Sequence, residues 1–417
     1  MLKSYLNALI QEGVLTVRIG KNRTYRFGTF QPDRPDLDIA IYIDSLWTAF
    51  KIGAQPYLHF GEAYTDGKLT VEKGTLWGLI ELIGINLPNA PKRGRLARWL
   101  HGFRNWLPVH SPDTSRRNVA HHYDLSERLY RLFLDEDMQY SCAYFRCPQA
   151  SLEDAQIAKK DHIADKLFLT PGQSVLDIGC GWGGMALHLA RQAGVNVTGV
   201  TLSTEQLAVA EQRALEPSVN ARVRFELCDY RLVSGLFDRI VSVGMFEHVG
   251  LAGFDGYFQT VADRLKPDGV ALIHTIGRRG KTSGRSAWLD KYIFPGGYIP
   301  SLSEITDSVE KSGLFITDIE SLRLHYAETL RHWRMRFEAH RAEIEALYDE
   351  RFGRMWEFYL CFCELGFRYG DLMVFQIQLA KKIDTLPITR DYMMPQASAR
   401  VAEPVQPDVL PVAARTG

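Results

Sequence analysis

A glycine-rich turn at residues 175–184, Val-Leu-Asp-Ile-Gly-Cys-Gly-Trp-Gly-Gly, joins an apolar run to a helical pattern. Gly179, Gly181 and Gly183 let the backbone pass close to a bound ligand, because they carry no Cβ. Asp177 within the motif would repel a pyrophosphate, whereas it suits a cationic or neutral ligand. The amino group and sulfonium of S-adenosylmethionine are such groups. The turn therefore predicts an S-adenosylmethionine site, with the dinucleotide site of a dehydrogenase as the competing interpretation.

Two more strand ends fit the same ligand. The second apolar run of this region ends in residues 199–206, where the ribose and adenine are expected to lie. Asp229 and Tyr230 follow the third run, as a contact with the edge of adenine would require. Successive strand ends thus contribute to one predicted cofactor site.

Four further segments carry residues that could do chemistry: 139–145, 243–250, 274–277 and 291–297. Each reactive residue also has a plain structural explanation. Cys142 could be a small buried residue, and His274 could be a core histidine whose ring is hydrogen-bonded. Glu247, with its neighbour His248, could cap a helix that follows. Their joint presence favours a catalytic set.

With the glycine motif, these segments resemble the cyclopropane-fatty-acid synthase family, which includes the mycolic acid cyclopropane synthases. The resemblance covers roughly residues 116–385, in order and with matching spacing. It implies a Rossmann-like class I methyltransferase fold and S-adenosylmethionine-dependent methyltransferase activity. The N-terminal part is similar, more loosely, to the long branch of the family that acts on phospholipids. The short mycolate branch lacks such a domain.

The resemblance also implies roles for individual residues. The family holds a bicarbonate ion at the reacting carbons, and the matching residues are Cys142, Glu247, His274, Ile276 (through its backbone) and Tyr326. The family's cofactor contacts map to Tyr140, Ser141, Gly179, Gly181, Thr201, Leu202, Gln206 and Tyr230. Methyltransferases in general have an acid at the end of the second strand that takes the ribose hydroxyls. Thr201 stands there in this chain, so Thr201 and Gln206 are expected to do that work.

The implied reaction transfers a methyl group from the sulfonium to a cis double bond in an unsaturated phospholipid acyl chain, which leaves a carbocation. The site must be dry, because water would quench the cation, and aromatic faces can stabilise it. Removal of one proton from the new methyl group then closes a cyclopropane ring. Bicarbonate held by His274 and Tyr326 and oriented by Glu247 would be the base. Glu247 itself is the rival base.

Three alternatives stay open at this point. A hydride shift in the same cation would give a methyl branch, and loss of a different proton would give a methylene branch. Related proteins of this fold methylate amines, although Cys142, Glu247 and His274 together favour carbocation chemistry. An alternative of another class is a non-catalytic lipid-binding protein built on a methyltransferase scaffold.

The elements that must position these residues follow from the periods of apolar residues. Strands are expected at residues 174–178, 195–200, 223–227, 239–243, 270–275, 315–319 and 373–379. Helices are expected between them and before them, including residues 118–134 and 151–168. This α/β alternation is typical of a mostly parallel, doubly wound seven-stranded sheet. A helical insertion at about residues 327–369, before the last strand, holds ten aromatics that either pack the core or wall an apolar substrate pocket.

The chain divides into four predicted parts. Residues 1–90 are expected to form a small α+β domain, with a helix at its start and strands at residues 14–19, 23–27, 40–43 and 69–71. Residues 91–117 carry seven Lys or Arg and one Asp, interleaved with Trp99 and Trp106. This segment is either a basic linker or a surface that touches anionic phospholipid headgroups. Residues 118–390 are the methyltransferase domain, and residues 391–417 a disordered tail.

Composition narrows the class of protein further. The 417 residues include 49 Lys or Arg and 49 Asp or Glu, so the balanced net charge gives no reason to expect nucleic acid. No apolar stretch reaches the ~18 residues of a membrane-spanning helix. Six scattered cysteines indicate a reducing cytoplasm rather than a disulfide framework. We expect a soluble enzyme at the inner face of the membrane, without a metal site, whose partners are phospholipid acyl chains and the membrane surface. The sequence leaves open whether the enzyme forms a homodimer.

Overall fold

A seven-stranded sheet forms the larger half of the molecule. In this computed structural model, residues 2–89, 126–280 and 286–394 are described. The sheet strands are β5 (Ser174–Ile178), β6 (Asn196–Thr201), β7 (Val223–Leu227), β8 (Phe237–Val243), β9 (Leu265–Arg278), β10 (Phe315–Ser321) and β11 (Leu372–Ala380). Their order is β10-β11-β9-β8-β5-β6-β7. Neighbouring strands from β9 to β7 are parallel, and β11 is antiparallel to both β9 and β10. The predicted class I methyltransferase fold is confirmed.

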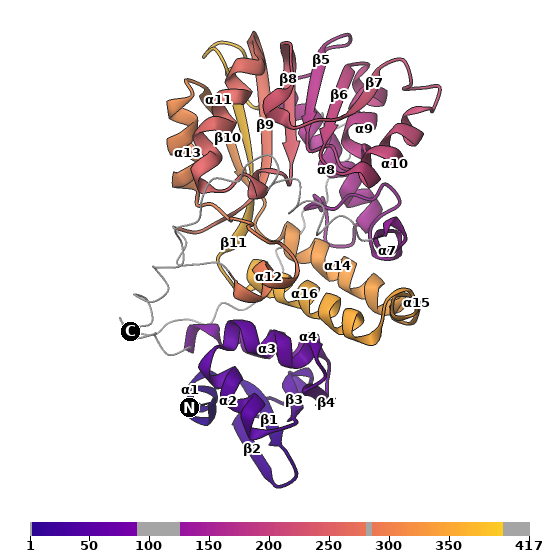
Figure 1. The fold of residues 1–417 in the computed structure, drawn as a ribbon. Coiled ribbons are helices and arrows are strands. Elements are labelled where there is room, and N and C mark those ends of the chain that lie inside the picture. The colour runs from indigo at the N-terminus through magenta and orange to yellow at the C-terminus, as the bar shows by residue number, and fades with distance from the viewer. Residues whose placement is uncertain (1, 90–125, 281–285, 395–417) are drawn as a thin grey trace.

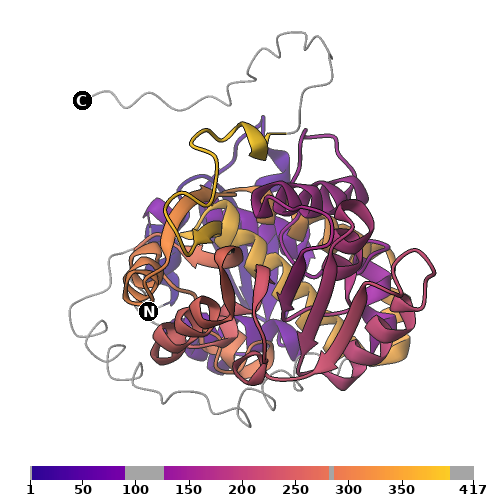
Figure 2. The same cartoon turned by 90° about the horizontal axis from the view of Figure 1, so that it is seen from above.

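Helices cover both faces of this sheet, as the view from above in Figure 2 shows. They are α8 (Leu152–Leu167), α9 (Gly184–Ala193), α10 (Thr204–Ala214), α11 (Phe254–Arg264) and α13 (Leu302–Lys311). The double cover explains why Val175, Leu176 and Ile178 of β5 are all buried. Helix α8 begins where the sequence indicates, because the Ser151 hydroxyl accepts a hydrogen bond from the Asp154 amide. The helix expected at residues 118–134 is seen as α7 (Glu127–Phe133); residues 118–125 lie outside the described residues.

The N-terminal residues form a second, four-stranded sheet with the order β2-β1-β3-β4. Its strands are β1 (Gly13–Ile19), β2 (Arg23–Thr29), β3 (Asp38–Ile43) and β4 (Leu69–Lys73). Its helices are α1 (Leu2–Leu9), α2 (Leu46–Ala54), α3 (Pro56–Thr65) and α4 (Leu76–Ile85). Each predicted strand of this region lies within one of the four observed strands.

The helical insertion links the two sheets. Helices α14 (His325–Ala339), α15 (Arg341–Leu347) and α16 (Glu350–Arg368) lie between β10 and β11 in the chain. In Figure 1 they lie between the large sheet above and the N-terminal elements below. Helix α16 packs on α3 and α4, and the Tyr64 hydroxyl donates a hydrogen bond to Glu357 at 2.6 Å. One hydrophobic core therefore runs from the N-terminal sheet through the insertion.

The aromatic residues of the insertion mostly build this core. Trp333, Phe337 and Trp356 are almost completely buried, and Phe352 and Phe362 are half-buried against the same cluster. The packing interpretation therefore holds for the three fully buried rings. Their contribution to stability is large, because each buried aromatic ring removes a large apolar surface from water.

The basic segment at residues 91–117 lies outside the described residues. The predicted tail begins at residue 391, but a short 3-10 helix, η7 (Asp391–Met393), is present there. Met393 is buried, and the Tyr392 hydroxyl lies 3.1 Å from Oε1 of Gln378. The packed chain thus extends beyond the predicted boundary at residue 390. Among the described helices, none has the length and apolar character to cross a membrane.

Candidate active site

A cavity of about 550 Å³ opens at the carboxyl ends of β5, β6 and β8. All ten residues predicted to bind the cofactor line it: Tyr140, Ser141, Asp177, Gly179, Gly181, Thr201, Leu202, Gln206, Asp229 and Tyr230. They come from four separate segments of the chain, which the parallel strands bring to one edge of the sheet. The cavity is large enough for a molecule of the size of a nucleoside cofactor.

The glycine turn exposes its backbone to this cavity. Gly181 has a φ of +55°, in the left-handed region that favours glycine, and no atom lies within 4 Å of where its Cβ would stand. A side chain there would therefore extend into the cavity. Beside it, Asp177 is buried, and its Oδ2 has no hydrogen-bond partner within the described part of the chain. Burial raises the pKa of Asp177 to about 7, and the charge of Lys159 opposes that rise.

On the side of the cavity where the ribose and adenine are expected, hydrogen bonds within the protein hold the lining side chains in place. Thr201 donates from Oγ1 to Oε1 of Gln206 at 3.2 Å, so the two residues assigned to the ribose hydroxyls lie side by side. Asp229 accepts two hydrogen bonds from the guanidinium of Arg231, at 2.8 and 2.6 Å. That ion pair holds the Asp229 carboxylate at the cavity wall.

Glu247 lies in a 3-10 turn, η5 (Phe246–His248), directly after β8. Its Oε1 accepts a hydrogen bond from the backbone amide of Ile276 at 2.6 Å. Its Oε2 is buried and has no partner among the described residues. Burial raises the pKa of Glu247 to about 7. The helix-capping explanation of Glu247 is wrong, because α11 begins only at Phe254 and Gly253 is its N-cap.

His274 is a buried residue of β9 whose ring is oriented from the neighbouring strand. Its Nδ1 lies 3.2 Å from Nε2 of Gln376 on β11. With the amide nitrogen of Gln376 donating, Nδ1 accepts and the ring hydrogen is on Nε2. Burial, followed by the positive charge of Lys159, holds the pKa of His274 well below its usual range. The ring is therefore neutral and offers one N–H.

Cys142 and Tyr326 complete the expected set on the side of the insertion. Tyr326 stands near the start of α14, with its ring centroid 4.6 Å from that of Phe367 and 5.8 Å from that of Trp333. Burial raises the pKa of Tyr326, and the nearby Cys142 and Glu247 contribute to the rise. The Cys142 thiol is buried, and burial raises its pKa as well. It is therefore a neutral thiol and no ready nucleophile.

None of the five residues Cys142, Glu247, His274, Ile276 and Tyr326 lines the cofactor cavity, but two of them are close in the chain to residues that do. Ser141 lines the cavity and Cys142 is the next residue; Met245 lines it and Glu247 follows two residues later. These two loops thus each carry a cavity-lining residue and a residue of the expected catalytic set. His274 and Ile276 are on β9 and Tyr326 is on α14.

Several residues that line the cavity were not predicted from the sequence. Met245, His248 and Arg231 also line the cavity. The first two lie in a segment already singled out, so their place after a strand could have indicated a cavity contact. Gln376 was missed as the partner of His274. The signal was the pair Gln376 and Gln378 in a strand whose other residues are apolar, since a buried amide needs a partner.

Comparison with known proteins identifies the family. A model of the family described as mycolic acid cyclopropane synthetase matches residues 110–377. The chain belongs to this family.

Curated relatives extend the match. The chain is 42% identical over 299 residues to the cyclopropane-fatty-acyl-phospholipid synthase of Escherichia coli, covering 68% of this chain and 77% of that protein. It is 40% identical over 351 residues to the tuberculostearic acid methyltransferase UfaA1 of Mycobacterium tuberculosis, covering 80% and 81%. It is also 41% identical over 295 residues to a probable fatty acid methyltransferase of Pseudomonas putida, covering 68% and 75%.

Solved structures agree with this placement. The cyclopropane synthase MmaA2 of Mycobacterium tuberculosis has a TM-score of 0.61 at 37% identity, covering 64% of this chain and 98% of that one. The mycolic acid cyclopropane synthase CmaA1, solved with S-adenosylhomocysteine, has a TM-score of 0.61 at 36% identity, with the same coverage. The chain with the sequence above is therefore an S-adenosylmethionine-dependent methyltransferase that transfers a one-carbon group to lipids. The dehydrogenase interpretation of the glycine turn is excluded.

Proposed function

We propose that this enzyme adds a methylene group from S-adenosylmethionine across the cis double bond of unsaturated acyl chains in membrane phospholipids, forming a cyclopropane ring. The observation that carries the proposal is that Glu247 and His274 are buried and Tyr326 is partly buried, while Met245 and His248, close to Glu247 in the chain, line the cofactor cavity. A methyl transferred to an alkene leaves a cation that must lose a proton before it meets water. A dry site with acid and base groups meets that requirement.

The aromatic residues around the set suit a cationic intermediate. The rings of Tyr140 and Trp333 are stacked with centroids 5.1 Å apart, and Tyr326 meets Trp333 edge-on. Ring faces attract a cation through their quadrupoles. In the reaction, the bond from sulfur to the methyl carbon breaks as a carbon–carbon bond forms, and S-adenosylhomocysteine leaves. Loss of a methyl proton then supplies the electron pair of the second ring bond.

For the base we propose bicarbonate, and the residues fit an anion with one hydroxyl. The unpartnered Oε2 of Glu247 can accept that hydroxyl, while the N–H of His274 and the hydroxyl of Tyr326 can donate to its oxygens. Bound there, bicarbonate would supply the acceptor for the methyl proton. The Ile276 amide donates to Glu247 in this structure, so we propose that it acts by orienting Glu247. Cys142 would contribute a neutral thiol contact.

A methyl-branching reaction is the second candidate. The match to the tuberculostearic acid methyltransferase spans 80% of this chain, more than the 68% matched by the cyclopropane synthase of Escherichia coli. Both products can arise from one cation, since they differ in what happens after methyl transfer. Prompt removal of a proton from the new methyl group, by a base held at Glu247 and His274, favours the ring over the methyl branch.

We also propose that the enzyme meets its substrate at a membrane surface, as a peripheral protein of the cytoplasmic face. Four apolar side chains on α2 and α3 are exposed: Leu46, Trp47, Phe50 and Tyr57. Trp47 and Phe50 stack with centroids 5.5 Å apart, and the Lys51 ammonium lies 5.5 Å from the Trp47 ring centroid. Tryptophan, tyrosine and lysine together suit the boundary between headgroups and acyl chains.

The test of the proposed function is incubation of the full-length enzyme with S-adenosylmethionine and vesicles of unsaturated phospholipid, followed by mass spectrometry of the acyl chains. A gain of one CH₂ with loss of the double bond supports the cyclopropane product. A gain of CH₂ plus two hydrogens supports a reduced methyl branch. Acyl chains that keep their mass while the cofactor is consumed on an added amine would overturn both candidates.

A further inference from the structure

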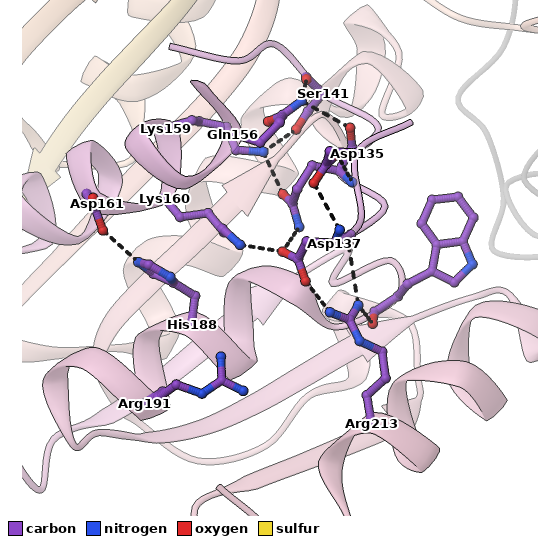
Figure 3. Close-up of polar contacts among 12 residues, drawn as sticks. Asp135, Asp137, Ser141, Gln156, Lys159, Lys160, Asp161, His188, Arg191 and Arg213 are labelled. Atoms are coloured by element: carbon purple, nitrogen blue, oxygen red, sulfur yellow. Dashed lines mark hydrogen bonds and ion pairs between the residues drawn. The ribbon is translucent and has the colours of Figure 1, made fainter. Parts of the chain in front are cut away.

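Lys159 is a completely buried lysine on α8 that the proposed chemistry does not use. Its ammonium donates to Oε1 of Gln139 at 2.5 Å and to Oγ of Ser141 at 2.9 Å. Both acceptors line the cofactor cavity. Figure 3 shows Lys159 directed from its helix toward the segment that carries Ser141. The lysine therefore contacts the cavity wall from behind.

Helix α8 holds the main chain of this wall as well as its side chains. Gln156, three residues before Lys159, donates from Nε2 to the carbonyls of Gln139 at 3.2 Å and Ser141 at 3.0 Å. On the opposite side, the Ala143 amide donates to Oγ1 of Thr329 on α14 at 3.0 Å. Residues 139–143, of which the first three line the cofactor cavity, are thus held between helices α8 and α14.

Charged and titratable groups face Lys159 from every neighbouring element. They are Asp135, Asp137 and Cys142 on the loop, Lys160 on its own helix, Asp177 on β5 and His274 on β9. Asp137 is already engaged, since it forms ion pairs with Lys160 and Arg213 (Figure 3). Asp177 is different, because its Oδ2 has no partner among the described residues.

Burying an ammonium is unfavourable unless nearby acceptors and negative charge compensate it. Burial lowers the pKa of Lys159 to about 8, with Asp135 acting in the opposite direction. For Asp177, the charge of Lys159 is what opposes the effect of burial. The charge of Lys159 on α8 therefore favours the ionised form of Asp177 on β5.

We propose that Lys159 is a positioning residue of the methyltransferase: its ammonium fixes Gln139 and Ser141 in the cavity wall and stabilises the Asp177 carboxylate that receives the cofactor's amino group. The proposal rests on the assignment of this cavity to S-adenosylmethionine and is independent of the lipid product. Lys159 touches neither the cofactor nor the substrate in this role. It acts through the residues that do.

A specific pH dependence follows from this arrangement. Below about pH 7 the Asp177 carboxylate becomes protonated, and above about pH 8 Lys159 loses its charge. Cofactor affinity should therefore fall at both ends of the range in the parent enzyme. Without the lysine charge, the pKa of Asp177 should rise further, because burial is then unopposed. In a variant without this charge, the loss of affinity at low pH (the acid limb) should therefore begin at a higher pH than in the parent. The loss of affinity at high pH (the alkaline limb) should disappear.

The experiment measures binding of S-adenosylhomocysteine to the full-length protein by titration calorimetry from about pH 6 to about 9, a range that spans both pKa values. Lys159→Met removes the charge at nearly equal length. At neutral pH we expect an affinity loss of about tenfold, the scale of one hydrogen bond to a charged group. If Lys159 had only a structural role, its replacement would not shift the acid limb to higher pH.

Lys166→Met is the matched control, because Lys166 is equally buried on the same helix but pairs with Glu320 and lines no part of the cavity. It should lose thermal stability and keep the parent's affinity and pH profile. An unshifted profile in Lys159→Met, or an equal shift in the control, would overturn the proposal. The parent enzyme provides a test that needs no variant, since a flat affinity across this pH range would overturn it too. Failure of the parent to bind the ligand at any pH would instead remove the cofactor assignment.

Discussion

The carboxylate of Glu247 and the backbone amide of Ile276 are joined by a hydrogen bond of 2.6 Å, which ties the turn after β8 to the neighbouring strand β9. The contact occupies one carboxylate oxygen and leaves Oε2 buried without a partner in the described part of the chain. Burial raises the pKa of this carboxyl to about 7. Glu247 is thus held in one orientation and changes charge near neutral pH.

The first prediction concerns pH. Because its pKa is raised, Glu247 is protonated below about pH 7 and ionised above it. Both proposed roles, accepting the bicarbonate hydroxyl or acting as the base, need the ionised form. Activity at saturating cofactor should therefore rise with pH through about 7. Glu247→Gln should lower the rate by about two to four powers of ten and remove this limb.

Rates on phospholipid vesicles across the pH range check this prediction. Saturating cofactor separates the Glu247 limb from the pH dependence of cofactor binding that involves Asp177. A Glu247→Gln variant that keeps the parent's acid limb would show that another group controls it.

The second prediction identifies the base. If bicarbonate is the base, His274→Ala should lose most of the activity, because the N–H that would hold the ion is gone. A loss of about two to four powers of ten is the usual scale for a positioned base. Added bicarbonate should restore part of the rate, and the parent enzyme should slow in carbonate-free buffer. Full activity of the parent without carbonate, with His274→Ala indifferent to it, would leave Glu247 as the base.

The third prediction concerns the glycine turn. Gly181→Val should abolish binding of S-adenosylhomocysteine, because the new side chain would occupy the cavity. Gly172→Val is a suitable control, since Gly172 also has a positive φ and open space at its Cβ but lies outside the cavity. Both variants bear similar backbone strain. Calorimetry should show lost affinity only for Gly181→Val, and equal affinities would contradict the cofactor assignment.

The fourth prediction concerns the exposed aromatic residues of α2. Replacing Trp47 and Phe50 by Ala should weaken association with phospholipid vesicles in a flotation assay, because two exposed aromatic side chains no longer enter the interface. Cofactor affinity should stay unchanged, since neither residue lines the cavity. Leu215→Ala, at a similarly exposed apolar position after α10, serves as the control. Unchanged flotation of the double variant would remove α2 from the membrane contact.

The fifth prediction concerns the basic segment that the sequence singles out. Replacing Arg93, Arg95 and Arg98 by Glu should reduce binding to anionic vesicles, and the parent's binding should weaken with salt. Exposed charges are screened within about 10 Å at 0.1 M ionic strength. Cofactor affinity serves as the internal control. Equal binding of the variant and the parent would return this segment to the role of a linker.

Local patterns were enough to predict most elements of the fold. The run at residues 174–178 contains Val175, Leu176 and Ile178 between turn residues, so its strand character is a property of the segment itself. Ser151 marked the start of α8, because a hydroxyl at that position can satisfy free amides of the first turn. The glycine turn likewise carried its own indication of a ligand.

Relations between distant segments were decided only by the tertiary structure. Nothing near Glu247 in the chain shows that it bonds to Ile276, and nothing near His274 shows that Gln376, 102 residues away, orients its ring. The sequence by itself determined which residues could carry the chemistry and which strand ends present them. Only folding decided which of them are dry, which carboxylate oxygen is left without a partner, and that Lys159 lies behind the cofactor wall. Burial and pKa depend on the groups that the packing of remote elements brings together.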